Sequence, residues 1–389
     1  MEHRSVRLPA PVAEAWASML LQRAGVPAGD AEEVARHLLF AELRGVSSHG
    51  LCRLPLYLQR LEAGGMERRA EPEIVRECPV SALVDGHNGL GQVVARRAAE
   101  LAARKAKAAG MAAVAVRNSN HCGCLAYYTL PMAEEGLIGF ATTNAMATMP
   151  PHGGAEPFLG TNPISLAAPA GYNAPFVLDM AASQAARGKI LSAAQAGREI
   201  PEGWALSRSG EPTTDPLEAL QGLVLPMAGP KGSALAFMVE ILAGILPGAL
   251  VGPAIPREPG EAQGVGHFFL ALRPDLFLPV EEFRRRMDRM MGQARQVRPL
   301  PGEKGVLLPG EIERLRTAEN ERLGIPLPPG LRAELEELAV RYGLPGPLEM
   351  AGEGVEEDGP ADAGGDRRHG AGGHPELPDL TAAGDPGGL

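Results

Sequence analysis

The feature that most constrains the fold is a predicted long, alanine-rich helix with a short apolar strand before it and another after it in the sequence. SALVDG (81–86) and MAAVAVRN (111–118) have the length and apolar content of buried strands, and QVVARRAAELAARKAKAAG (92–110) is typical of the helix between them. A strand, a covering helix and a second strand in this order form the unit of α/β sheets. The chain is therefore predicted to be an α/β protein whose largely parallel or mixed sheet has both faces covered.

Further strands and helices divide the chain into four parts. The strands LIGFATTNA, PISLAAPA, FVLDMA and GHFFLALR lie between residues 137 and 273, and helical patterns precede and follow this region. We expect a helical N-terminal part (1–75), an α/β domain (76–275) and C-terminal helices (276–346) that pack with the N-terminal part. Residues 347–389 are Gly, Pro and charged residues with almost nothing to bury, which predicts a disordered tail.

Charge and hydropathy exclude two classes of partner. The net charge is −10, whereas a nucleic-acid-binding protein needs a basic surface. The most apolar stretch, ALAFMVEILAGIL (234–246), contains Glu240 and is shorter than the roughly 20 residues that span a bilayer. The N-terminus has no signal-peptide pattern and the four cysteines give no disulfide framework, so we expect a soluble, cytoplasmic protein.

The segment RNSNHCGCLAYY (117–128) concentrates polar and sulfur-containing side chains at the end of a predicted strand. His121, Cys122 and Cys124 could bind zinc, the cysteines could form a redox pair, or His121 could be catalytic and the thiols incidental. No convincing fourth zinc ligand is found in the sequence, and C-x-C is one residue short of the usual redox spacing. A histidine at the carboxyl edge of a sheet, where α/β proteins bind ligands, favours the catalytic interpretation without a metal.

A second polar segment, LRGVSSHG (43–50), stands between two predicted helices and leads into Arg53 and Tyr57. A His followed closely by an Arg suits a substrate with a carboxylate, because Arg binds the carboxylate through two hydrogen bonds and His moves a proton. Taken alone, the segment is equally typical of a turn between helices.

Two glycine-containing segments are candidates for a phosphate site. NGLGQVV (88–94) lies between a strand and a helix, but Val94 replaces the third glycine of the dinucleotide fingerprint, which favours a simple helix-entry turn. PMAGPKGS (226–233) lacks the first glycine of a phosphate loop, yet Lys231 and Gly232 open a buried helix whose N-terminal amides suit an anion. A plain glycine-rich turn is the alternative there.

With these segments placed, the chain resembles the malate/L-lactate dehydrogenase family of the second type. That family includes ureidoglycolate, diketogulonate and sulfolactate dehydrogenases and the piperideine or pyrroline carboxylate reductases. The resemblance covers about residues 10–345 and rests on motifs that occur in the same order. They are LRGVSSHG with Arg53, VRNSNHCG, GTNPISLAAPA, VLDMAAS with ARGKI, GPKGSALAFMVEILAG, GHFFLALRPDLF and LLPGEIE.

The resemblance implies a fold, a cofactor and an assembly. The fold would be a non-Rossmann NAD(P)-binding sheet domain, sulfolactate-dehydrogenase-like, with a helical domain built from the N- and C-terminal helices. The cofactor would be NAD or NADP, and Arg187 could meet the 2′-phosphate of NADP. The assembly would be a homodimer.

The resemblance also implies the functional residues. His121 would be the acid/base residue, with Ser48 and His49 in the same pocket, although the roles of His49 and His121 could be exchanged. Arg53 and Tyr57 would contact the substrate. The implied cofactor contacts are Asp179, Met180, Ala181, Lys231, Gly232, Pro309, Gly310 and Glu311.

The sequence therefore predicts an NAD(P)-dependent oxidoreductase that transfers hydride between nicotinamide and C2 of a small, malate- or lactate-like 2-hydroxy or 2-oxo acid. A histidine near its free pKa of about 6.5 would move the accompanying proton. One alternative is an NADPH-dependent cyclic imine (piperideine or pyrroline-2-carboxylate) reductase. A non-catalytic metabolite-binding relative and a zinc-dependent enzyme are the others. The sequence leaves open both the substrate and the choice between NAD and NADP.

Overall fold

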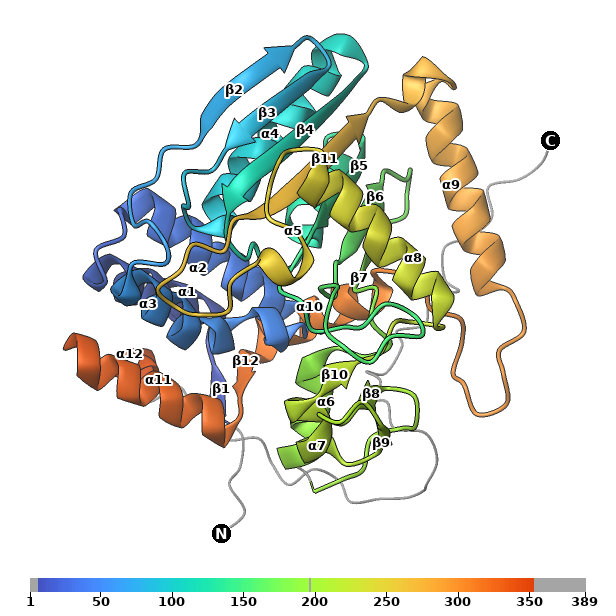
Figure 1. Cartoon of the computed structure of the whole chain (residues 1–389). Coiled ribbons are helices and arrows are strands. Elements are labelled where there is room, and N and C mark those ends of the chain that lie inside the picture. Colours follow the sequence, from blue (N-terminus) through green and yellow to red (C-terminus); the bar gives the residue numbers. More distant parts are fainter. Residues whose placement is uncertain (1–5, 196, 353–389) are drawn as a thin grey trace.

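The structure, a computed structural model, describes residues 6–195 and 197–352. Its main sheet has the strand order β2-β3-β4-β11-β5-β6-β7 (Figure 1). These strands are β2 (Glu73–Cys78), β3 (Ser81–Asp85), β4 (Met111–Ser119), β5 (Ile138–Thr143), β6 (Ile164–Ala168), β7 (Phe176–Met180) and β11 (Val265–Leu272). The predicted α/β class is confirmed.

The sheet is mixed, which is the second of the two arrangements that the sequence predicts. Only β3 and β4 run parallel among the neighbouring strands of this sheet, and the other pairs are antiparallel. The reason is β11, which returns late in the chain and inserts between β4 and β5 in the opposite direction. A single crossover through a helix therefore suffices for the whole sheet.

Helices cover both faces of the sheet. The helices α4 (Gly91–Ala109) and α5 (Ala126–Glu134) pack on one face, and α8 (Pro230–Val239) with the π-helix η3 (Glu240–Ile245) packs on the other (Figure 1). Side chains alternate along a strand, so successive residues of β11 point to opposite faces of the sheet. Phe269 packs in the core on the α4 side, and Phe268 contacts Phe140 on the α8 side. The buried alanines of α4 recur every three or four residues, which lets this helix lie close to the sheet.

Helices from both ends of the chain pack together. They are α1 (Ala10–Arg23), α2 (Ala28–Leu43), α3 (Leu54–Ala63), α10 (Glu311–Leu323), α11 (Pro329–Tyr342) and α12 (Pro347–Ala351). A two-stranded sheet of β1 (Val6–Leu8) and β12 (Ile325–Leu327) joins the two ends, and Asn320 donates to the carbonyls of Glu42 and Leu43 at 3.2 and 3.0 Å.

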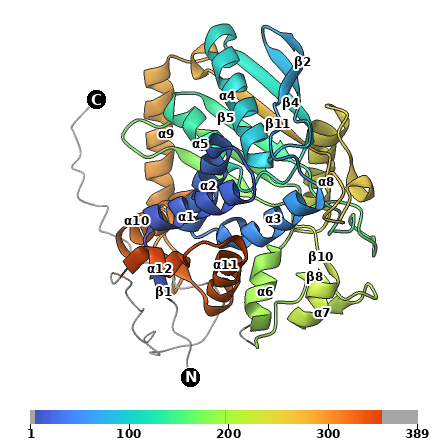
Figure 2. The ribbon, with the colours of Figure 1, turned by 90° about the vertical axis from the view of Figure 1, so that its left-hand side faces the viewer.

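One predicted C-terminal helix packs elsewhere. Helix α9 (Val280–Arg295) stands at the β7 end of the sheet, away from α1 to α3 (Figures 1 and 2). It is held there by Asp288, which accepts hydrogen bonds from the backbone of Gly171, Tyr172 and Asn173 at 3.1 Å each. The expectation that all helices of 276–346 pack with the N-terminal part is therefore corrected for α9. Its buried carboxylate needs hydrogen-bond donors, and the backbone amides of the loop before β7 supply them.

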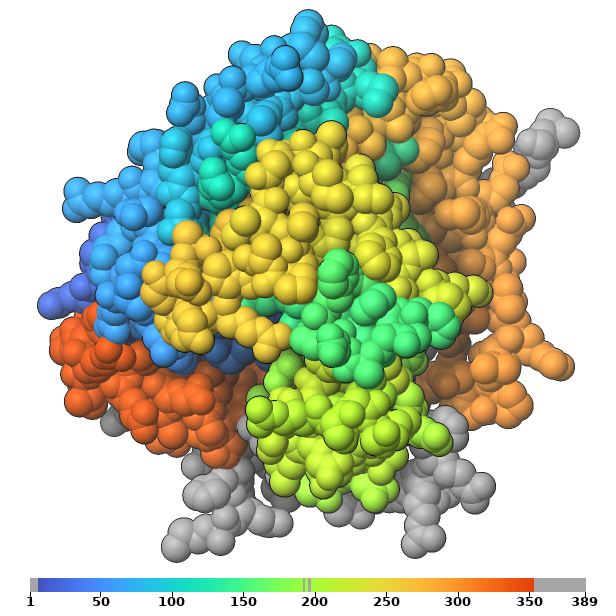
Figure 3. Space-filling model, in the orientation of Figure 1, coloured from blue at the N-terminus to red at the C-terminus, as the bar shows by residue number. Residues whose placement is uncertain are grey.

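Two features of the fold had no clear sequence signal. A small unit of short elements projects from the main body, at the bottom of Figure 3. It consists of α6 (Arg187–Gln195), α7 (Pro216–Gln221) and a sheet of β8 (Ala205–Leu206), β9 (Pro212–Thr213) and β10 (Leu223–Val224). The second feature is the segment 250–264, which crosses the surface above α3 before β11 begins (Figure 3).

The C-terminal boundary differs from the prediction. Residues 347–351, placed in the disordered tail, form α12, and Leu348 and Met350 pack against the core of the N-terminal helices. The rest of the predicted tail, residues 353–389, lies outside the described residues. Within the described part of the chain, no helix is both long and apolar enough to cross a membrane.

The position of α12 predicts how far the chain can be shortened. A chain ending at Gly346 should lose about 1–3 kcal/mol of unfolding free energy, because Leu348 and Met350 no longer cover apolar side chains. A chain ending at Gly352 keeps every one of these contacts and should unfold at the same urea concentration as the full chain. Equal stability of the two shortened chains would show that α12 contributes nothing.

Candidate active site

His121 lies in the turn between β4 and α5, at the edge of the sheet. Its Nδ1 is 2.8 Å from the hydroxyl of Tyr57 on α3, and its backbone N–H donates to Gln263 Oε1 at 3.1 Å. The turn is possible because Asn118 and Gly123 adopt positive φ angles of 52° and 76°, which Asn and Gly tolerate. The residue as a whole is half-buried.

The SSHG segment brings a second histidine to the same place. It forms one turn of 3-10 helix, η1 (Ser47–His49), and the rings of His49 and His121 stack with centroids 5.5 Å apart. Ser48 Oγ is 2.9 Å from His49 Nδ1, and Arg53 Nε donates to the Ser48 carbonyl at 2.5 Å. The structure thus brings together four side chains that were predicted from separate motifs.

A buried carboxyl group that sequence reasoning missed fixes this turn. Glu42 of α2 accepts a hydrogen bond from the Leu51 backbone at 2.8 Å. A Cβ on Gly50 would lie 2.1 Å from Glu42 Oε1, so only glycine fits after His49 without displacing this carboxyl. Burial raises the pKa of Glu42 to about 7. A single Glu in a helix gave no sequence signal, because its partner is set by tertiary packing.

Burial and a nearby cation hold both active-site imidazoles in the neutral form. The pKa of His49 is lowered to about 3, first by burial and then by Arg53. The pKa of His121 is lowered well below its usual value of 6.5 by the same two causes. The sequence-based assumption of a histidine near its free pKa is therefore wrong. Among the described residues, the groups acting most strongly on both rings are Arg53 and other histidines, which suits an anionic substrate.

A third histidine, which sequence reasoning also missed, supports the strand end below His121. His267 of β11 is fully buried, and its two ring nitrogens lie 2.8 Å from Ser119 Oγ and 2.8 Å from Thr143 Oγ1. Burial lowers the pKa of His267 to about 3, so it acts as a neutral link between β4, β11 and β5. These two hydrogen bonds fix the end of β4, where the His121 turn begins.

Cys122 and Cys124 are buried thiols rather than reactive groups. Burial raises the pKa of Cys122 to about 12 and that of Cys124 above its usual range. The Cys124 sulfur lies 3.7 Å from Nε2 of the buried His37. Thiols that stay protonated are poor nucleophiles and poor metal ligands, which argues against the redox and zinc interpretations. Over residues 6–195 and 197–352, no group of three or more His, Cys, Asp or Glu side chains could hold a metal ion.

Several predicted cofactor contacts meet where β7 ends. The strand end consists of Asp179, Met180 and Ala181. Gly232 of α8 packs directly on the following residue, since a Cβ there would lie 2.5 Å from the Ala182 carbonyl. Lys231 is exposed beside this contact, and the first amides of α8 have no side-chain cap. The amides of Gly232 and Ser233 donate to the carbonyls of Met227 and Gly229, so this surface offers a phosphate the ammonium group of Lys231 at the positive end of the helix.

The predicted turn Pro309–Glu311 packs on the other half of β7. Gly310 has a φ of 89°, and a Cβ on it would lie 3.0 Å from Val177. Glu311 forms an ion pair with Arg295 at 2.5 Å and accepts a hydrogen bond from the Leu308 backbone at 2.7 Å. The Glu311 carboxylate is therefore already bonded within the protein.

The NGLGQVV segment is a helix-entry turn that packs on the His121 turn. Helix α4 begins at Gly91, where a Cβ would lie 2.2 Å from the Asn120 carbonyl and 2.3 Å from the His121 carbonyl. Asn120 Nδ2 donates to the Gly89 carbonyl at 2.8 Å. The turn contacts protein backbone at these points, which confirms the helix-entry interpretation over the dinucleotide fingerprint.

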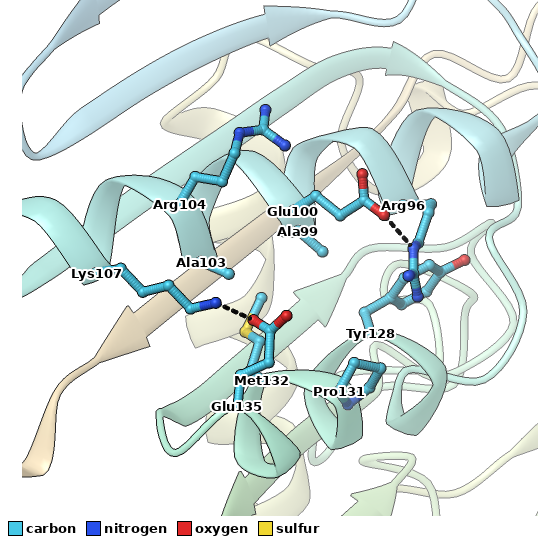
Figure 4. A pocket seen from close by; sticks show the side chains of 10 residues that line it. All are labelled: Arg96, Ala99, Glu100, Ala103, Arg104, Lys107, Tyr128, Pro131, Met132 and Glu135. Carbon is cyan, nitrogen blue, oxygen red and sulfur yellow. Dashed lines mark hydrogen bonds and ion pairs between the residues drawn. The ribbon is translucent and has the colours of Figure 1, made fainter.

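A separate pocket of about 230 Å³ lies between α4 and α5 (Figure 4). Its charged side chains largely pair with one another: Arg96 bonds Glu100 at 2.7 Å, and Lys107 bonds Glu135 at 3.0 Å. None of the predicted site residues lines it. It is therefore distinct from the candidate active site.

Known proteins with similar sequences define the class of this chain. The L-sulfolactate dehydrogenase of Methanocaldococcus jannaschii is 41% identical over 84% of this chain and 94% of its own length. The malate dehydrogenase of Pyrococcus horikoshii is 39% identical over 89% of this chain and 98% of its own length. Relatives that use either cofactor occur: a (2R)-3-sulfolactate dehydrogenase (NADP+) from Chromohalobacter salexigens and a ureidoglycolate dehydrogenase (NAD+) from Escherichia coli.

Solved structures agree with this class. The M. jannaschii sulfolactate dehydrogenase matches with a TM-score of 0.82 at 38% identity, over 88% of this chain and 99% of that one. The Δ1-piperideine-2-carboxylate reductase of Pseudomonas syringae matches with a TM-score of 0.78 at 31% identity, over 86% and 99%.

A profile of the malate/L-lactate dehydrogenase family matches residues 8–336, and the chain belongs to this family. The predicted class of NAD(P)-dependent oxidoreductase is confirmed.

If His121 is the acid/base residue, its lowered pKa predicts the pH dependence of turnover. Oxidation of a hydroxyl group requires a neutral ring that accepts a proton, and reduction requires the protonated ring. With a pKa below 6.5, the oxidative kcat/KM should be flat from about pH 6.5 upward, and the reductive kcat/KM should fall about tenfold per pH unit there. Both values of kcat/KM are measured as a function of pH at saturating cofactor concentration.

A substitution at Arg53 tests whether its positive charge lowers the pKa of His121. Arg53→Gln removes a cation that lowers the pKa of His121, so the break in the oxidative profile should move to higher pH. Arg198→Gln removes an exposed positive charge elsewhere and should leave the break in place. A wild-type break at about pH 7 or above would contradict the burial argument.

Proposed function

We propose that the protein transfers hydride between a nicotinamide and C2 of a 2-hydroxy acid that carries a second acid group, or of the corresponding 2-oxo acid. The observation that carries this proposal is the group of His121, His49 and Arg53, in which two neutral imidazoles lie beside a guanidinium group. Such a set binds a carboxylate and exchanges a proton with the neighbouring oxygen.

Each residue has a separate role in the proposal. Arg53 binds the carboxylate next to C2, and His121 exchanges the proton with the oxygen on C2. His49 and Ser48 line the same side of the site. Tyr57, expected to contact the substrate, is 1% exposed and bonded to His121, so we assign it to His121 instead.

The cofactor fits the surface where β7 meets α8. The ammonium group of Lys231 would hold a phosphate at the start of α8, and Asp179, Met180 and Ala181 would lie along the bound molecule together with Gly232. Pro309 and Gly310 would contribute through their backbone, since the Glu311 carboxylate is bonded to Arg295. When bound, the nicotinamide supplies or accepts the hydride.

Two further arginines support a second acid group on the substrate. Arg187 precedes Gly188, whose Cβ would lie 3.0 Å from Ser48 Cβ, so it borders the site. Burial and the neighbouring Arg257 lower the pKa of Arg187. The Arg187 guanidinium group donates to the Leu220 carbonyl and that of Arg257 to the Ala147 carbonyl, which leaves further N–H donors on both for an acid group. Sulfolactate and malate, on which the relatives at 41% and 39% identity act, each carry a second acid group.

We also propose a homodimer that works in the cytoplasm. Phe237, Ile241 and Ile245 recur every four residues along α8 and η3 and are 41%, 55% and 64% exposed, which supports burial by a second copy. All four cysteines are free, as expected in a reducing compartment.

A substrate screen tests the function. NADH or NADPH oxidation at 340 nm is followed with oxaloacetate, 3-sulfopyruvate, pyruvate and a cyclic imine carboxylate. We expect kcat/KM for one diacid to exceed that for pyruvate by at least about tenfold, the value of one charge-assisted hydrogen bond. A preference for the imine would identify a reductase, and no turnover with any of them would contradict the proposal.

Matched variants connect the activity to the site. His121→Asn should lower turnover by roughly 10²–10⁴-fold while cofactor binding by fluorescence stays unchanged. Cys122→Ala should keep most of the activity, because no thiolate is required. Loss of activity in the cysteine variant alone would contradict the assignment of His121.

The assembly has its own test. Ile241→Asp should convert the dimer to a monomer in sedimentation experiments, because a carboxylate replaces an apolar contact at the centre of the exposed stripe. Val340→Asp changes an 83%-exposed valine on α11 and should leave the dimer intact. A wild-type protein that sediments as a monomer would contradict the homodimer.

A further inference from the structure

The side chain of Asn144 joins the two ends of the segment 250–264. Its Nδ2 donates to the Leu250 carbonyl at 2.8 Å, and its Oδ1 accepts from the Gly266 backbone at 2.9 Å. The Leu250 N–H in turn donates to the Gly264 carbonyl at 2.9 Å, so the ends of the segment meet as they do in an Ω-loop. These hydrogen bonds are shielded from water, since Asn144 is only 2% exposed.

A buried carboxyl group fixes the direction in which the Asn144 amide points. Glu240 of η3 is 5% exposed, and its Oε2 accepts from Asn144 Nδ2 at 3.1 Å. Its Oε1 accepts from Nδ2 of Asn162, a second buried asparagine, at 3.0 Å. If the Asn144 amide were rotated, its oxygen would face the Leu250 carbonyl and its NH2 group would face the Gly266 N–H. Both backbone contacts would then be lost, so the amide has a single favourable orientation.

A glycine in η3 makes room for this arrangement. A Cβ on Gly244 would lie 3.1 Å from Asn144 Nδ2 and 3.1 Å from Glu240 Oε2. It would also lie 2.4 Å from the Val251 side chain. Gly244 therefore allows η3 to lie against both the asparagine and the first residues of the segment 250–264.

The segment that Asn144 closes brings two side chains to the active site. Gln263 accepts from the His121 backbone, and the guanidinium group of Arg257 donates to the Ala147 carbonyl. Asn144 and Ala147 both lie in the stretch that follows β5, so this stretch holds the segment at its ends and near its middle. The position of Arg257 therefore depends on how the ends of the segment are closed.

We propose that Asn144 is a positioning residue for substrate selection, which closes the segment 250–264 and so holds Arg257 where the second acid group of the substrate binds. The proposal rests on the proposed function, in which Arg187 and Arg257 support such an acid group. Asn144 is buried and its polar atoms are bonded within the protein, so it acts through Arg257. Arg257 is exposed, and on a loose segment its guanidinium group would have to be ordered when substrate binds, which costs conformational entropy.

Hydrogen exchange of the full-length protein measures the closure without any substrate. Asn144→Leu has a similar volume but no hydrogen-bonding group, and Asn144→Ser is too short to bond both Leu250 and Gly266. In both variants, the backbone amides of residues 250–266 should exchange at least about tenfold faster than in the wild-type protein. Asn320→Ser removes a buried asparagine of α10 that also bonds two backbone carbonyls, and should leave exchange in this segment unchanged.

A kinetic measurement connects the segment to substrate selection. The measured value is kcat/KM for the preferred diacid divided by kcat/KM for pyruvate, so that losses common to both substrates cancel. Asn144→Ser should lower this ratio by about three- to tenfold, and Arg257→Gln should lower it by at least as much, because a charge-assisted hydrogen bond is weakened or lost. The double variant should lose no more than Arg257→Gln alone, because Asn144 acts through Arg257. Asn320→Ser should keep the wild-type ratio.

Unchanged exchange in both Asn144 variants would overturn the proposal. Faster exchange with an unchanged ratio would also overturn it, as would effects of the two substitutions that simply multiply in the double variant. A wild-type protein that shows no preference for a diacid would contradict the proposed function instead. The exchange measurement would still decide whether Asn144 holds the segment, because it requires no turnover.

Discussion

The close contact between the start of α4 and the His121 turn is the constraint on which the rest of the site depends. A glycine at position 91 lets the helix lie against the carbonyls of Asn120 and His121, at a distance that no other side chain would permit. The same helix, α4, is also the crossover that connects the parallel strands β3 and β4. The helix that organises the sheet therefore also positions the histidine.

The electrostatics of the site follow from what surrounds the two stacked imidazoles. Burial disfavours their charged forms, and Arg53 adds repulsion, so both rings are neutral. The cost of gathering a guanidinium group and two histidines falls when an anion binds, because its charge offsets that of Arg53. A site of this kind favours a carboxylate substrate on physical grounds, in agreement with the family to which the chain belongs.

Long-range packing adds the parts of the site that adjacent residues cannot supply. Segment 250–264 crosses α3, and Arg60 on that helix donates to the carbonyls of Arg257 and Glu261 at 3.2 and 3.1 Å. This holds Gln263 against the backbone of His121. Directly afterwards β11 enters the middle of the sheet and places His267 under the same turn. One late part of the chain thus supports a site whose motifs lie in its first third.

The sequence by itself determined the α/β class, the helical ends, the family and the two histidine motifs, because periodicity and short motifs are local properties of the chain. It also separated NGLGQVV from a true dinucleotide fingerprint, since the missing glycine is visible in the letters. Only the tertiary structure decided the antiparallel place of β11, the position of α9, the ordered α12 and the neutral state of the histidines. It also revealed Glu42, Gln92 and Gln263 as partners of the site residues. Each of these depends on burial or on contacts between residues far apart in the chain, and a pKa or a hydrogen-bond partner is a property of that surrounding structure, which no local pattern contains.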